Sequence, residues 1–130
     1  MKNLSIILLI LLAVKINAQV VNIPDANFKN YLINRTYIDT NKDTEIQVSE
    51  ALAYKGEIFL HGEKISDLTG IEAFENLTSL TLRFNGLAVL NVSKNTKLEQ
   101  LTCDGNQLTS IDLSKNISLS SLNLSNNQLT

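Results

Sequence analysis

Apolar residues recur in the C-terminal half of the chain with a period of 21 residues. The first copy of the pattern consists of Leu77, Leu80, Leu82, Asn85 and Leu87, and the same spacing returns from residue 98 and from residue 119, with Cys103 in one leucine position. A more degenerate copy precedes these, in which Ile58, Leu60 and Ile65 stand 22 residues before Leu80, Leu82 and Leu87. Since alternate residues of a strand share one face, each L-x-L predicts a short strand with two inward side chains.

The spacing L-x-x-L-x-L-x-x-N-x-L is the pattern of a leucine-rich repeat. We expect an α+β repeat protein, a solenoid of about 3.5 coils, with a degenerate first coil at 57–76, complete coils at 77–97 and 98–118, and an incomplete one at 119–130. The regularly placed asparagines are predicted to form a structural ladder, because their amides can bond backbone groups of the adjacent coil. These are Asn85, Asn95, Asn106, Asn116 and Asn127.

Residues 19–56 differ from the repeats and predict a helical cap. Pro24 and Asp25 are typical of a helix start, and Phe28, Tyr31 and Leu32 follow at helical spacing. A solenoid would otherwise expose the apolar end of its first coil to water, so this helix is expected to act as a lid.

Within the cap, residues 39–50 match a twelve-residue EF-hand loop at positions 1, 3, 5 and 12. The predicted Ca²⁺ ligands are Asp39, Asn41, Asp43, Glu45 through its carbonyl, Gln47 through a water, and Glu50. Thr44 departs from the motif, because position 6 normally requires a glycine for its unusual backbone angles. A calcium site and a metal-free acidic turn are both compatible with this sequence.

The first eighteen residues have the layout of a secretory signal peptide. Lys2 precedes an eleven-residue apolar core, Leu4 to Val14, and the segment closes on the small residue Ala18. That core is well short of the roughly 20 residues needed to cross a bilayer. We expect cleavage before Gln19 by a bacterial Sec-type pathway, no membrane span in the mature chain, and a secreted or cell-surface location.

Charge and cysteine content narrow the partner classes. The chain carries 11 Lys and Arg against 13 Asp and Glu. Because Lys2 and Lys15 lie in the leader, the mature chain has a net charge of about −4. The basic residues are scattered, which argues against nucleic acid as a partner. The single cysteine, Cys103, excludes an intramolecular disulfide and is interpreted as core filler.

The sequence contains no convergent set of catalytic groups, since His61 is the only histidine. We therefore expect no enzyme but a binding surface on the outward side of the strands. Its candidate residues are Phe59, Thr81, Thr102 and Asn123 in one column across the coils, His61, Arg83 and Asp104 in the next, and Phe84 beside Arg83. Exposed aromatic residues next to arginine are typical interface anchors, although Phe59 and Phe84 could equally pack against the cap or a turn.

The segment LTGIEAFENLTSL at 68–80 and the later NQLTS blocks resemble bacterial internalin-like secreted leucine-rich-repeat proteins over residues 20–130. The resemblance implies a curved solenoid whose strand-lined face binds proteins or glycans. The alternative is a structural or adhesive N-terminal piece of a longer surface protein, with a calcium-stabilised cap and no specificity of its own. Because the sequence stops in mid-coil, an open strand edge is expected there, and such an edge permits end-to-end self-association.

Overall fold

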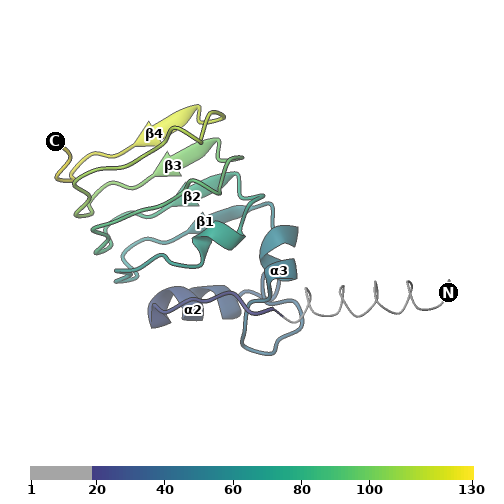
Figure 1. Ribbon diagram of the computed structural model, residues 1–130. Helices are drawn as coiled ribbons and strands as arrows, with labels where there is room; N and C mark the ends of the chain where they lie inside the picture. Colours follow the sequence, from purple (N-terminus) through teal and green to yellow (C-terminus); the bar gives the residue numbers. More distant parts are fainter. Residues whose placement is uncertain (1–18) are drawn as a thin grey trace.

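A computed structural model describes residues 19–130, which form a helical cap followed by a stack of coils (Figure 1). The cap contains α2 (Ala26–Ile33) and α3 (Val48–Ala53), and the coils contribute four short strands and one turn of 3₁₀ helix, η1 (Ile71–Ala73). The strands are β1 (Glu57–Phe59), β2 (Ser79–Thr81), β3 (Gln100–Thr102) and β4 (Ser121–Asn123). The expected signal peptide, 1–18, lies outside the described residues.

Helix α2 begins where Pro24 and Asp25 predicted a start. The Asp25 carboxylate accepts hydrogen bonds from the backbone N–H groups of Asn27 (3.0 Å) and Phe28 (3.1 Å), which have no partner within the helix. Its second oxygen accepts from the backbone N–H groups of Ser66 (3.0 Å) and Asp67 (3.3 Å). A single carboxylate therefore both caps α2 and ties the cap to the first coil.

The four strands form one parallel sheet in the order β1-β2-β3-β4 (Figure 1). Residues at the same repeat position pair directly, so that Ile58, Leu80, Leu101 and Leu122 stand side by side. Backbone pairing continues beyond the strand ends, for example from Leu82 N–H to the Thr102 carbonyl (2.7 Å). The 21-residue sequence period is thus the length of one turn of the solenoid.

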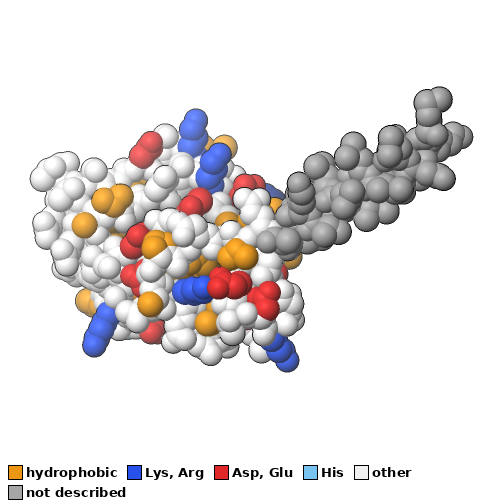
Figure 2. All heavy atoms as spheres, turned by 60° about the horizontal axis from the view of Figure 1, so that its bottom comes forward, with side chains coloured by type: hydrophobic (Ala, Val, Ile, Leu, Met, Phe, Trp, Pro, Cys, Tyr) orange, Lys and Arg blue, Asp and Glu red, His pale blue; other side chains and the backbone are white. Residues whose placement is uncertain are grey.

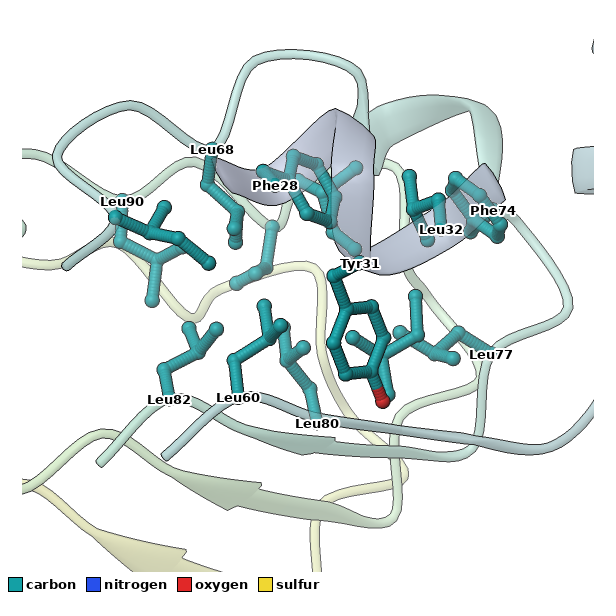
Figure 3. Packing of buried hydrophobic residues seen from close by; sticks show 14 of the residues in the cluster. Phe28, Tyr31, Leu32, Leu60, Leu68, Phe74, Leu77, Leu80, Leu82 and Leu90 are labelled. Atoms are coloured by element: carbon teal, nitrogen blue, oxygen red, sulfur yellow. The ribbon is translucent and has the colours of Figure 1, made fainter. Parts of the chain in front are cut away.

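The core is a column of apolar side chains enclosed by the coils. Leu80, Leu82, Leu101 and Cys103 are fully buried, and Phe28 and Leu32 of α2 close the lower end of the column. Figure 3 shows these α2 side chains directed toward the leucines of the first coils. Each such burial contributes about 1.5–3 kcal/mol, which explains why a small domain without a disulfide can hold together.

Asparagine amides connect the backbones of successive coils. Asn85 donates to the Leu60 carbonyl (3.0 Å), Asn106 to the Leu82 carbonyl (2.7 Å) and Asn127 to the Cys103 carbonyl (2.8 Å). On the opposite half of each coil, Asn95 donates to the Ile71 carbonyl (2.8 Å) and Asn116 to the Val92 carbonyl (2.9 Å). These bonds satisfy buried carbonyls that the short strands leave unpaired.

The last described coil is less buried than those before it. Leu122 of β4 is 49% exposed and Leu129 is 41% exposed, whereas the equivalent Leu101 and Leu108 are fully buried. Among the described strands, β4 pairs only with β3. Residues that repeat identically in sequence therefore differ in burial because of their place in the stack.

Candidate functional site

The predicted columns of outward residues exist in the strand pairing. Phe59, Thr81, Thr102 and Asn123 occupy matching positions in β1 to β4. Thr81 is only 8% exposed, so this predicted partner-binding residue offers little contact area in the structure. The Thr81 hydroxyl donates a long hydrogen bond (3.4 Å) to the Glu57 carboxylate, while Thr102 is half-buried and Asn123 is exposed.

Three aromatic rings gather at the β1–β2 end of this face. The ring centroid of His61 lies 6.3 Å from that of Phe59 and 5.5 Å from that of Phe84. Phe59 is 50% exposed and Phe84 is 52% exposed, so neither ring is buried against the cap. We call Phe59, His61 and Phe84 the aromatic cluster. It is an exposed apolar surface of the kind that anchors interfaces.

The backbone around Phe84 fixes the position of its ring. Phe84 adopts a positive φ of 51°, and its ring lies against Gly105 of the next coil. A Cβ atom on Gly105 would stand 2.4 Å from Cδ1 of Phe84. The absence of a side chain on Gly105 therefore makes room for the Phe84 ring, and the φ of +70° at Gly105 also favours glycine.

An ion pair holds the cationic residue beside the cluster. Nε of Arg83 lies 2.9 Å from Oδ1 of Asp104, and Nη2 donates to Oδ2 at 3.4 Å. The Asp104 side chain is 5% exposed and that of Arg83 is 42% exposed. Asp104, predicted as a partner-binding residue, therefore exposes little of its carboxylate. It instead orients the Arg83 guanidinium, which lies 5.7 Å from the Phe84 ring.

Side-chain oxygen atoms of the EF-hand-like loop accept hydrogen bonds from backbone N–H groups of the same loop and so fix its conformation. Asp39 accepts from the backbone N–H groups of Lys42 (2.7 Å) and Thr44 (3.2 Å), and Asn41 accepts from Asp43 N–H (2.9 Å). Asp43 accepts from Glu45 N–H (2.9 Å). These bonds curl the chain so that the side chains at positions 1, 3 and 5 share one turn.

Glu50 closes the loop from the first turn of α3. Oε1 accepts from the backbone N–H of Thr40 (2.8 Å) and Oε2 from that of Gln47 (3.0 Å), and the residue is 8% exposed. Amide groups fill the space between the acids, since Asn41 Nδ2 donates to both Gln47 Oε1 (2.7 Å) and Asp43 Oδ2 (3.0 Å). The backbone donor of Glu45 and the amide of Gln47 lower the pKa of Asp43, which keeps this carboxylate ionised.

Thr44 adopts the conformation that a glycine normally supplies at position 6. Its φ is 68°, in the left-handed region that a β-branched residue disfavours. The loop therefore keeps the expected backbone path at the cost of local strain, of order 1–3 kcal/mol for a residue in such a region.

Two contacts attach the loop to the rest of the cap. The Lys29 ammonium of α2 lies 2.7 Å from a carboxylate oxygen of Glu45, which directs that side chain away from the loop interior and leaves only its carbonyl as a candidate ligand. Gln47 forms an isolated antiparallel bridge with Val20, in which Val48 N–H donates to the Gln19 carbonyl (2.8 Å). The loop is thus tied to the first residues after the expected cleavage point.

Within residues 19–130, no group of three or more His, Cys, Asp or Glu side chains is arranged to hold a metal ion. A cation in this loop would need the Asn41 amide oxygen and the Glu45 carbonyl beside the carboxylates, which is the mixed oxygen set of an EF-hand. Over the same part of the chain, no helix is both long and apolar enough to span a membrane. On the face seen in Figure 2, Lys and Arg side chains are spread out rather than gathered into a basic stripe.

Comparison with known proteins places these features in a structural class. No family model matches the sequence, and no curated protein matches it. Among solved structures, the functional domain of InlJ from Listeria monocytogenes, which includes a cysteine ladder, is 31% identical with a TM-score of 0.73. The match covers 86% of this chain and 25% of that one. The internalin InlF from the same species is 25% identical with a TM-score of 0.73, over 82% of this chain and 32% of that one.

A weaker likeness extends to the structure of the CBM51-2 and INT domains of ZmpB from Clostridium perfringens, at 26% identity and a TM-score of 0.51 over 73% of this chain. The internalin-like relationship expected from the repeats is thereby confirmed, and the fold is of the leucine-rich-repeat type. The chain spans about a quarter of the InlJ chain and about a third of the InlF chain. Cys103 stands alone in its column, between Leu82 and Leu124 of the neighbouring coils.

Proposed function

We propose that this chain is an exported binding module that recognises a protein or glycan, at or outside the cell surface, through the outward face of its parallel sheet. The observation that carries the proposal is the aromatic cluster beside Arg83. Phe59 and Phe84 are half-exposed and lie outside the buried core cluster, and Asp104 fixes the neighbouring Arg83 guanidinium. Rigid aromatic residues next to an oriented arginine are the usual high-energy anchors of interfaces.

The test uses the immobilised protein to capture partners from cell-surface extract. Phe59→Ala with Phe84→Ala is expected to abolish specific capture while leaving Tm nearly unchanged, because both rings are half-exposed. Arg83→Ala is a poorer test, because it would leave the buried Asp104 carboxylate without its guanidinium partner. The matched control is Val89→Ala with Ile117→Ala, which removes two other exposed apolar side chains, 76% and 89% exposed. Equal capture by both double variants would refute the proposal.

We further propose that the loop at 39–50 binds Ca²⁺ and stabilises the cap. The supporting observations are the three acids at positions 1, 5 and 12, the left-handed backbone at Thr44, and the Glu45 carbonyl, which accepts no backbone hydrogen bond within residues 19–130. Binding requires the Asn41 amide to turn its oxygen inward, where its Nδ2 now bonds Asp43 and Gln47. The bridge from Gln47 to Val20 would transmit this stabilisation to the N-terminal end of the module.

Calcium is titrated against the protein by calorimetry and by the shift in Tm. Thr44→Gly is expected to raise both affinity and stability, because it removes the strain of a β-branched residue at positive φ. Glu50→Gln is expected to lose the calcium response while it keeps an oxygen acceptor for the Thr40 N–H. If neither the natural protein nor Thr44→Gly responds to calcium, the loop is a metal-free turn.

A second candidate function, a structural or adhesive piece of a larger assembly, is favoured by the last described coil. Leu122 and Leu129 there remain 49% and 41% exposed, although their equivalents in the preceding coil are buried. A second copy stacked on β4 would cover them. Light scattering at increasing protein concentration tests self-association. If the natural protein stays monomeric at every concentration, a second copy does not stack on β4. If Leu122→Lys still dimerises, the association does not involve the β4 face.

Export is proposed from the layout of the first eighteen residues. The expected product is a chain that begins at Gln19, which N-terminal sequencing of the secreted protein would identify. A retained leader would contradict cleavage.

A further inference from the structure

One side of α2 carries a stripe of amide side chains that the sequence analysis did not single out. Asn27, Asn30 and Asn34 follow one another at three and four residues, so they share one side of the helix. With Tyr31, Arg35 and Glu63 they line a groove of about 190 Å³ between α2 and the turn after β1. We call this the amide groove. All three asparagines are exposed.

The amide groove adjoins the aromatic cluster. The Tyr31 hydroxyl accepts a hydrogen bond from the backbone N–H of Phe59 (2.9 Å), and Asn27 Nδ2 donates to the Lys64 carbonyl (3.2 Å). Figure 3 shows the Tyr31 ring extending from α2 with its hydroxyl near the strands. Glu63 follows His61 by two residues. Helix α2 therefore lies beside β1, and the groove reaches the turn after β1, which also carries His61 of the aromatic cluster.

The groove offers both hydrogen-bond donors and hydrogen-bond acceptors on its amide side chains. Asn34 Nδ2 donates to the carbonyl (2.7 Å) and to Oδ1 (2.8 Å) of Asn30. Among the contacts of residues 19–130, Oδ1 of Asn34, Oδ1 of Asn27 and Nδ2 of Asn30 have no hydrogen-bond partner. Sugar hydroxyls both donate and accept, so neighbouring hydroxyls of one ring match neighbouring amides.

Charge and rigidity favour a neutral ligand. Arg35 and Glu63 contribute one positive and one negative charge, so the groove has no net charge to attract an anionic chain. The Arg35 guanidinium lies 3.2 Å from the centroid of the Tyr31 ring and donates to the Tyr31 carbonyl (2.7 Å). An extended peptide added to the β1 edge would need the Phe59 N–H, which the Tyr31 hydroxyl already occupies.

We infer that the amide groove and the aromatic cluster together bind a neutral oligosaccharide, with sugar hydroxyls on the asparagines and an apolar sugar face on Phe59 or Phe84. This inference rests on the proposed binding function and names its ligand class. Two types of contact are needed. Hydrogen bonds to the asparagine amides select the positions of the sugar hydroxyls, and stacking of the sugar ring on an aromatic face keeps water away from those hydrogen bonds.

The experiment titrates the purified, isotope-labelled protein with linear tetramers of glucose, mannose and N-acetylglucosamine, and with a heparin tetrasaccharide as the charged counterpart. At least one neutral tetramer is expected to shift the amide resonances of Asn30, Asn34 and Phe84, and heparin none of them. Asn30→Ala and Phe59→Ala should each weaken the binding about tenfold, the equivalent of one lost hydrogen bond or stacking contact. Asn22→Ala with Gln107→Ala, which removes two exposed amides outside the groove, should leave the affinity unchanged.

Several outcomes would overturn the inference. These are no resonance shift with any neutral tetramer, shifts confined to residues away from the groove, binding unaffected by Asn30→Ala, or equal binding of heparin. The shift map uses the unmodified protein, so it decides the matter even if a variant fails to fold. If no sugar binds but partner capture still depends on Phe59 and Phe84, the ligand is a protein surface, and the proposed function stands without this inference.

Discussion

The contribution of the asparagine ladder can be measured at Asn106, in the middle of the stack. Nδ2 donates to the carbonyls of Leu82 (2.7 Å) and Cys103 (3.1 Å), and Oδ1 accepts from the backbone N–H of Leu87 (3.1 Å). Asn106 is 7% exposed, so water cannot replace these partners. Asn106→Ala would leave at least the Leu82 carbonyl and the Leu87 N–H buried without a partner.

Each buried group left unsatisfied costs about 1–3 kcal/mol, so the expected loss in the free energy of unfolding is about 2–6 kcal/mol. For a domain near this size, about 1 kcal/mol lowers Tm by roughly 4–8 °C, which predicts a fall in Tm of about 10 °C or more. In Asn106→Asp, one carboxylate oxygen can still accept from the Leu87 N–H, but the other lies against the carbonyl oxygens of Leu82 and Cys103 and repels them. This variant should therefore be no more stable than Asn106→Ala at neutral pH.

Calorimetric and urea-induced unfolding provide the measurements, and Gln107→Ala provides the control. Gln107 is the next residue, its side chain is exposed, and its removal should change stability by less than about 0.5 kcal/mol. If Asn106→Ala costs no more than Gln107→Ala, the amide bonds between coils do not stabilise the stack, and the apolar column alone holds it together.

Three further predictions concern the cap, the aromatic cluster and the core. Burial raises the pKa of Asp25, but hydrogen bonds from four backbone N–H groups lower it by more, so the pKa in the folded protein lies below the ordinary value. The stabilisation from Asp25 is therefore present above roughly pH 4 and is lost as the pH falls through the folded pKa. Asp25→Ala should therefore lower the free energy of unfolding by about 1 kcal/mol at neutral pH, and the difference from the natural protein should disappear in acid. A difference that does not change with pH would show that the ionised carboxylate is not its cause. Gly105→Ala should weaken partner capture by displacing the Phe84 ring. The control is Gly62→Ala, which also places alanine at a positive φ (+67°) but has nothing near the added Cβ. It should lose about 1 kcal/mol of stability from backbone strain and leave capture unchanged. Burial raises the pKa of Cys103 to about 12, so a thiol reagent at pH 8 should react with Cys103 only in molecules that have unfolded. If the folded protein reacts as fast as the protein in urea, the thiol is exposed.

The sequence alone identified the repeat because its physical cause is local and periodic. A leucine every two or three residues must face the same interior in each coil, so the 21-residue period directly reports one turn of the solenoid. The start of α2 was also readable, because Pro24 and Asp25 act on backbone groups only a few residues away. The pattern of acids in the loop was visible for the same reason.

Tertiary structure alone decided which of the outward residues are accessible. Thr81 and Asp104 have the same alternation as Phe59, but neighbouring coils cover the first two and leave the phenylalanine half-exposed. The amide groove escaped detection because it joins α2 to a turn more than 25 residues away, and helical spacing alone does not reveal what faces it. A repeat sequence thus determines which side chains point inward, since that follows from a fixed period. Accessibility on the outer face depends on contacts between coils and with the cap, and a one-dimensional pattern does not encode those contacts.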